Sequence, residues 1–163
     1  MAVATPDRTS SDILVGMGQV TLAEAPARLH AILGSCVAIA VFHPRQKIAA
    51  LAHVVLAAAM GRGGSPGKYA DTAVPHILAA MKAAGAGPAG LVAKIAGGAN
   101  MFAHRGPLQI GDSNIQAVLA ALSAHGIAVS ARDVGGNAGR RVILVPASGE
   151  LIVECAGKPP RVL

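Results

Sequence analysis

The sequence has few aromatic residues and few charged ones. Aromatic side chains make up 2% of the 163 residues, with no tryptophan, one tyrosine and two phenylalanines. Proteins that bind single-stranded nucleic acid stack bases on aromatic side chains, and this chain has too few for such a platform. The net charge is +6, but apart from Arg140-Arg141 the basic residues are scattered singly. We therefore expect no nucleic-acid partner, and an acidic protein surface is the partner that the charge favours.

Cysteines and long apolar runs are scarce as well. Cys36 and Cys155 are the only cysteines, so the chain is not a disulfide-rich scaffold. The longest uncharged apolar run, residues 48–60, is too short to span a bilayer and contains a histidine, so we expect no insertion into the membrane. The first twelve residues lack the apolar core of a signal peptide, which favours a cytoplasmic protein with reduced thiols. A disulfide between the two cysteines is the alternative.

What the sequence does contain is a series of short apolar runs with the composition of strands. Pro44 presets a turn that joins two of these runs as a hairpin. Strands outnumber the helical segments, which predicts a mixed α/β sandwich in a single domain over residues 12–163, after a flexible segment at residues 1–11. The expected strands are residues 12–17, 28–33, 36–42, 47–56, 91–96, 127–133, 142–145 and 151–155.

Two segments repeat apolar residues at the spacing of a helix. Residues 74–81 and 115–122 each place apolar side chains at i, i+3, i+4 and i+7, which predicts one apolar stripe per helix. Gly85 and Gly126 are the expected ends. The expected N-terminal caps are Asp71 or Thr72 for the first helix and Asp112 or Ser113 for the second.

Cys36 is a candidate nucleophile because of the residues that precede it. A turn at Gly34-Ser35 would expose the sulfur and bring backbone N–H groups close to it, and such donors can hold the oxyanion of a tetrahedral intermediate. The alternative is that Cys36 is a buried strand residue, since free cysteine is among the most buried residue types.

His53 is the candidate partner of Cys36. An imidazole in such an apolar strand is costly to bury unless it is hydrogen-bonded, and a satisfied core histidine is the ordinary explanation. The hairpin favours the catalytic interpretation over a core histidine, because a turn near Pro44 pairs Cys36 with a residue close to His53. Cross-strand neighbours lie about 4.5–5.5 Å apart, within reach of a thiolate–imidazolium contact.

The remaining candidates have weaker signals. His30, six residues before Cys36, can orient His53, face solvent, or join both residues as a zinc ligand, but the spacing matches no zinc motif. The glycine-rich segments at residues 96–100 and 134–139 lack the spacing of a phosphate-binding loop, so we interpret them as tight turns. Residues 60–68 form a further glycine-rich segment, which we expect to be an exposed loop beside the substrate.

Six motifs, taken together, resemble one known family. LGSCVAIAVFHP, LAHVVL, GKYADTAV, AKIAGGANMF, IGDSN and DVGGNAGR occur in this order, and the combination is similar to the CheD family of chemoreceptor glutamine deamidases. The resemblance covers roughly residues 12–155. It implies a fold like that of the cysteine-dependent deamidase toxins, with mixed sheets packed together and helices on the outer faces.

The resemblance also implies a reaction and its residues. Such enzymes convert glutamines of methyl-accepting chemotaxis receptors to glutamates, and a CheC-type phosphatase is a second partner. The family cysteine corresponds to Cys36 and the family histidine to His53, while His30 stands where the family normally has threonine. No metal or organic cofactor is implied.

Three hypotheses follow for the activity and the site. The first is a glutamine deamidase in which Cys36 attacks and His53 transfers protons. The second is a weak or inactive adaptor that binds receptors or the phosphatase, and the third is a cysteine hydrolase with another substrate. For the deamidase, the backbone of Ser35 and Cys36 is the expected oxyanion hole, and the expected substrate contacts are Gly34, Ser35, Lys68 and Tyr69.

Overall fold

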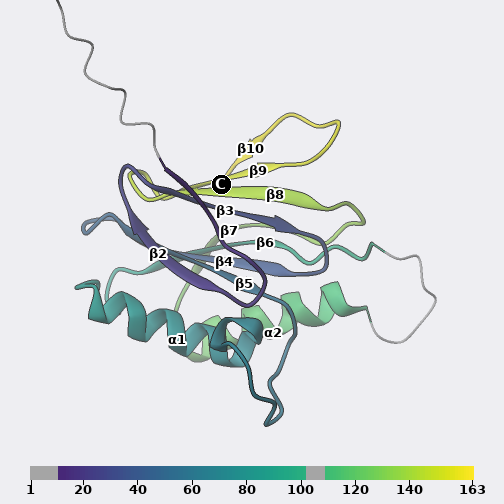
Figure 1. Ribbon diagram of the computed structural model, residues 1–163, viewed down its shortest axis with the longest axis horizontal. Coiled ribbons are helices and arrows are strands. Elements are labelled where there is room, and N and C mark those ends of the chain that lie inside the picture. Colours follow the sequence, from purple (N-terminus) through teal and green to yellow (C-terminus); the bar gives the residue numbers. More distant parts are fainter. Residues whose placement is uncertain (1–10, 102–108) are drawn as a thin grey trace, which may run out of the picture.

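A computed structural model describes residues 11–101 and 109–163, which form two five-stranded sheets and two helices (Figure 1). The segment that we expected to be flexible, residues 1–11, lies almost entirely outside these residues. The first sheet has the order β1-β3-β8-β9-β10 and the second the order β2-β5-β4-β6-β7. In the first sheet the strands are β1 (Asp12–Leu14), β3 (Arg28–Leu33), β8 (Arg140–Val145), β9 (Glu150–Glu154) and β10 (Arg161–Val162). In the second they are β2 (Val20–Glu24), β5 (Ile48–Val54), β4 (Val37–His43), β6 (Val92–Gly97) and β7 (Val129–Val134).

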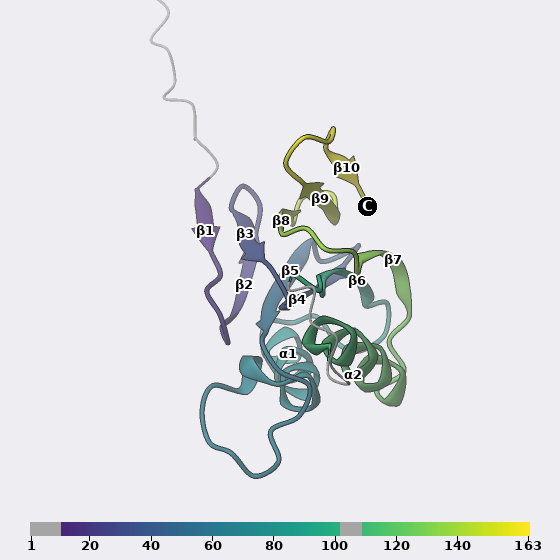
Figure 2. The same ribbon diagram turned by 90° about the vertical axis from the view of Figure 1, so that its right-hand side faces the viewer.

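The second sheet is the middle layer of the molecule, with the first sheet on one side and both helices on the other (Figure 2). The helices are α1 (Ala70–Ala83) and α2 (Ile110–Ala124), and a short 3₁₀ turn, η1 (Pro66–Lys68), precedes α1. A strand covered on both faces needs apolar side chains at nearly every position. This is why β4 reads VAIAVFH, with Val37, Ile39 and Val41 in the core on the helix side.

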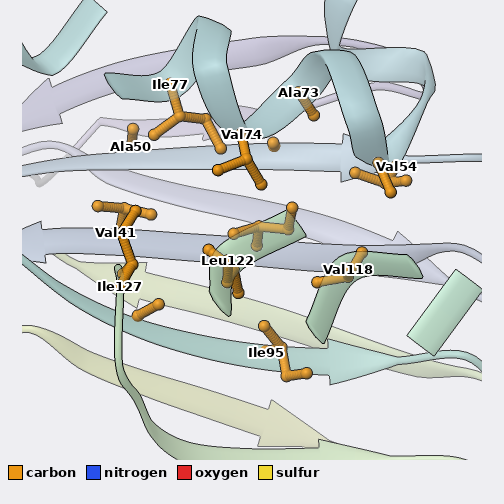
Figure 3. Close-up of a cluster of buried hydrophobic side chains, with 14 of the residues drawn as sticks. Val41, Ala50, Val54, Ala73, Val74, Ile77, Ile95, Val118, Leu122 and Ile127 are labelled. Carbon is orange, nitrogen blue, oxygen red and sulfur yellow. The ribbon is translucent and has the colours of Figure 1, made fainter. Parts of the chain in front are cut away.

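Two cores hold the three layers together. On the helix side, the apolar stripes of α1 and α2 pack on β4, β5 and β6, with Ile77 and Leu122 among the fully buried side chains (Figure 3). Between the sheets, alanines of β4 and β5 pack against Leu29, Leu33 and Leu144 of the first sheet. The small alanines let the two sheets approach closely, and Phe42 packs against this core as a partly buried side chain.

The sandwich that the sequence predicts is confirmed, and the expected strands match β1 and β3–β9. Strands β2 and β10 were not expected. Both helices lie on the same outer face, not one on each. No helix within residues 11–101 and 109–163 is long and apolar enough to cross a bilayer.

The expected N-terminal caps of the two helices are wrong. The residues that precede the helices are Tyr69 and Gln109, and neither makes a side-chain cap hydrogen bond. Asp71 lies inside the first turn of α1, where its carboxylate accepts the N–H of Ala59 at 3.1 Å. The apolar stripes placed the helices correctly, but a cap depends on which backbone donors are already satisfied by the loop before the helix.

Candidate active site

The register of the β4–β5 hairpin places Cys36 and His53 on the same face of the second sheet. Val37 pairs with Val54 and Ala38 pairs with His53. Cys36 precedes Ala38 by two residues and belongs with it to the core between the sheets. Side chains two residues apart on a strand share a face, so Cys36 is a diagonal cross-strand neighbour of His53. The sequence therefore predicted the correct hairpin, and Cys36 lies immediately before β4, two residues from Ala38, the ladder partner of His53.

The imidazole of His53 has one nitrogen occupied and one free. The ring is 3% exposed, and its Nδ1 lies 3.0 Å from the carbonyl oxygen of Val15. A carbonyl can only accept, so Nδ1 carries the hydrogen and donates it. In the neutral ring, Nε2 then carries a lone pair. Nε2 is buried and has no hydrogen-bond partner among the described residues. His53 is thus held in the tautomer that can accept a proton from a thiol.

In the loop that carries Cys36, the carbonyl groups are hydrogen-bonded, and the N–H groups of Ser35 and Cys36 have no partner among the described residues. Unpaired N–H groups are uncommon where the backbone is shielded from water, and two successive ones can bind a developing oxyanion. The carbonyls of Gly34, Ser35 and Cys36 accept hydrogen bonds from Ala99 N at 3.0 Å, Asn114 Nδ2 at 3.0 Å and Gly98 N at 2.8 Å.

Burial raises the pKa of the Cys36 thiol, and the backbone N–H of Cys36 itself lowers it by a smaller amount. The residue is 8% exposed, so a thiolate would lose most of its hydration. Desolvation at this position therefore favours the neutral thiol over the thiolate. It opposes the thiolate–imidazolium pair that the sequence led us to expect, and that pair stays a prediction.

We expect the alkylation of Cys36 by iodoacetamide to follow this raised pKa. The thiolate is the reactive form, so a higher pKa leaves less thiolate at any given pH. The midpoint of the curve of alkylation rate against pH therefore moves to higher pH. Peptide mapping of the modified protein across a pH series, with glutathione as the reference thiol, measures the shift. A curve displaced to lower pH than that of glutathione would instead indicate a thiolate already stabilised by His53.

The structure does not bring His30 to this pair. The buried residues Leu29 and Ala31 alternate with it along β3 and face the core between the sheets. His30 therefore points to the opposite, outer face of the first sheet. The partner that orients His53 is the backbone carbonyl of Val15, which no side-chain pattern can reveal.

The expected substrate contacts separate into two groups. Gly34 and Ser35 are half-buried in the loop that carries Cys36. Tyr69 is only 3% exposed, and its hydroxyl donates to the carbonyl of Gly63 at 3.3 Å, so its ring is not available at the surface. Lys68 places its ammonium 5.5 Å from the centre of that ring, and its carbonyl accepts the N–H of Val55. Lys68 thus lies next to the chain that leaves β5.

Sequence reasoning missed Asn114, the residue of α2 that donates to the loop of Cys36. It is fully buried and belongs to the inward face of the helix. Asn114 and Val118 lie four residues apart on the same apolar stripe. A polar side chain on such a stripe is the signal that could have identified it.

A cavity of about 610 Å³ lies elsewhere, between β7 and the C-terminal strands, and includes neither Cys36 nor His53. The glycine-rich segment at residues 134–139, of which 134–138 line the cavity, is organised by Arg140, which donates to the Asp133 carboxylate and to the carbonyls of Gly135 and Ala138. These donors are already used within the loop, which agrees with the tight turns that we expected.

Cys155 also lines this cavity, and its thiol donates to the carbonyl of Gly139 at 3.5 Å. Both cysteines are free. Among the described residues, no group of three or more His, Cys, Asp or Glu side chains is arranged to hold a metal ion.

Comparison with known proteins gives consistent matches. Residues 56–155 match the family model "CheD: CheD chemotactic sensory transduction". A "Probable chemoreceptor glutamine deamidase CheD" of Symbiobacterium thermophilum is 43% identical over 152 residues, which cover 88% of this chain and 92% of that protein. The "Chemoreceptor glutamine deamidase CheD" of Thermotoga maritima is 41% identical over 145 residues, or 88% and 92% of the two chains. A similar protein of Methanococcus vannielii is 42% identical over 141 residues, or 85% and 92%.

Proposed function

The chain belongs to the CheD family, and we propose that it deamidates glutamine side chains of chemotaxis receptors through a thioester on Cys36. The observation that carries this proposal is the buried Nε2 of His53, which has no hydrogen-bond partner among the described residues and lies on the same face as the Cys36 thiol. The relatives are named as chemoreceptor glutamine deamidases, which supports the substrate and the reaction.

The first half of the reaction forms the thioester. The Cys36 sulfur attacks the carboxamide carbon of the glutamine while its proton passes to Nε2 of His53. The oxyanion that forms on the amide oxygen accepts hydrogen bonds from the N–H groups of Ser35 and Cys36. The carbon–nitrogen bond then breaks, and the imidazolium returns the proton to the leaving amino group, which departs as ammonia.

The second half regenerates the thiol. Water attacks the thioester carbon and gives a proton to Nε2 of His53. The carbon–sulfur bond breaks, the sulfur of Cys36 takes the proton back, and the product is a glutamate. The hydrogen bond from Nδ1 of His53 to the Val15 carbonyl stabilises the imidazolium in both halves, because a charged donor makes a stronger hydrogen bond. The net charge of +6 assists the approach of an acidic receptor surface.

Two observations favour a second candidate function. Burial raises the pKa of the Cys36 thiol, and His30 occupies the position where the family resemblance leads us to expect threonine. Both features suit an adaptor that keeps the fold, binds receptors or a CheC-type phosphatase, and has little activity of its own.

Mass spectrometry of a receptor signalling fragment incubated with the protein distinguishes the two functions. For the deamidase we expect specific glutamines to gain the mass of a carboxamide-to-carboxylate conversion, with release of an equal amount of ammonia. A fragment that co-elutes with the protein but keeps all its glutamines would support the adaptor. The variant His30→Thr, assayed in parallel, measures whether the unusual residue limits the rate.

A further inference from the structure

The side chain of Asn114 joins the two chain segments that carry the proposed nucleophile and base. Its Nδ2 donates to the carbonyl of Ser35 at 3.0 Å and to the carbonyl of Val55 at 2.9 Å. Both partners only accept, so the amide nitrogen must face them. Ser35 immediately precedes Cys36, and Val55 follows His53 by two residues. One amide thus bonds to both segments from a third element, α2.

These two carbonyls lie just past the end of the β4–β5 ladder. The last paired residues are Val37 and Val54. Beyond this pair, no ladder hydrogen bond sets the distance between the segment before β4 and the segment after β5. Asn114 connects the two segments at this point, because its amide nitrogen donates to a carbonyl in each of them.

The hydrogen bond to the Ser35 carbonyl also fixes the direction in which the N–H of Cys36 points. The peptide bond between Ser35 and Cys36 is planar, and in a trans peptide the C=O and the N–H point opposite ways. Holding the Ser35 carbonyl toward α2 therefore aims the N–H of Cys36 away from α2. This N–H has no acceptor among the described residues and lies close enough to its own sulfur to lower the thiol pKa.

Asn114 has a feature that packing alone does not explain. The residue is 0% exposed, and its Oδ1 has no hydrogen-bond partner within residues 11–101 and 109–163. A buried polar atom without a partner destabilises a fold, and an apolar side chain such as leucine would avoid that loss. What the amide contributes is the pair of bonds made by its nitrogen.

We propose that Asn114 is a positioning residue for deamidation, which orients the Cys36 N–H as an oxyanion donor by holding the Ser35 carbonyl. The inference rests on the proposed function and extends it to a residue that does not touch the substrate. Without this bond the Ser35–Cys36 peptide can rotate, and its N–H is then poorly aligned when the negative charge develops on the substrate oxygen.

The test compares Asn114→Ala and Asn114→Asp with the wild type in the receptor deamidation assay. Loss of an oxyanion donor lowers kcat by about 100- to 1,000-fold, so a misaligned donor is expected to lower it by roughly 10- to 100-fold. KM should change by less than about 2-fold, because the interaction is made only in the transition state. In Asn114→Asp, the side chain has at most one hydrogen for the two carbonyls, and only when the acid is protonated, so kcat should fall as well.

Two comparisons separate positioning from stability. Val118→Ala removes two buried methyl groups one turn further along α2. It should lower the thermal midpoint and leave kcat per folded molecule unchanged. Alkylation of Cys36 by iodoacetamide forms no oxyanion, so in the Asn114 variants its limiting rate, reached at a pH where the thiol is fully ionised, should stay within about 3-fold of wild type while deamidation falls. Rates are divided by the folded fraction from circular dichroism, so partial unfolding does not obscure the result.

The outcomes are distinct. If the wild type leaves receptor glutamines unchanged, the proposed function fails. If the wild type deamidates them and the Asn114 variants keep a wild-type kcat per folded molecule, as Val118→Ala should, then this inference alone is overturned. It is overturned as well if deamidation and the limiting rate of alkylation fall together, because that result indicates a displaced thiol.

Discussion

Replacing Cys36 by alanine is expected to lower receptor deamidation by at least about 1,000-fold, because the sulfur forms the covalent bond to the substrate and no other group can replace it. Small amounts of activity can remain, since the N–H groups of the loop still polarise the amide carbonyl of a bound glutamine. The measurement is ammonia release together with the mass of the modified receptor peptide. Receptor binding should be retained, because an alanine at a buried position of this size leaves the surface unchanged.

Cys155→Ala is the matched control for this variant. Cys155 is the other free thiol, and it lies beside Gly139 in the wall of the separate cavity. We expect this variant to keep wild-type activity. Equal losses in the two variants would mean that activity depends on thiols in general and not on the sulfur of Cys36.

Replacing His53 by glutamine is expected to lower kcat by roughly 100- to 10,000-fold, the range in which a general base contributes. Glutamine can still donate a hydrogen bond to the Val15 carbonyl, so the local fold is preserved. It cannot accept the thiol proton and pass it to the leaving ammonia. The assay is the same as for Cys36→Ala, with the rate expressed per folded molecule.

His43→Gln is the control for the loss of a buried imidazole. His43 is 9% exposed and lies at the turn end of the same hairpin, where its ring contacts the Ala89 carbonyl at 3.1 Å and accepts the N–H of Gln46. This variant should lower stability and leave kcat unchanged. If His43→Gln and His53→Gln lower kcat equally, the role of His53 is structural and the proposed base is wrong.

The hairpin that carries this site could be predicted from the sequence because its register depends on local signals. Pro44 marks the turn, and the apolar runs on either side have similar length, so the pairing that places Cys36 near His53 follows from counting residues outward. The same reasoning gave the helical stripes. Local patterns were sufficient to predict contacts between residues that are close in sequence or share one helix or hairpin.

Contacts between distant elements could not be predicted in this way. His30 is six residues from Cys36, but its side chain points to the outer face of the first sheet, and a spacing between two strands does not fix which faces meet. The orienting group of His53 is a backbone carbonyl, at Val15, and any residue type supplies one. Asn114 reaches Ser35 from 79 residues away, through packing of α2 on the second sheet.

Interception of the reaction by hydroxylamine tests most directly whether the substrate passes through a thioester on Cys36. A thioester divides between water and a stronger nucleophile, so glutamines modified in its presence should become glutamyl hydroxamates in increasing proportion as the hydroxylamine concentration rises. The account predicts this product with the wild type and none with Cys36→Ala. Continued deamidation by the wild type that yields only glutamate at every hydroxylamine concentration would contradict it.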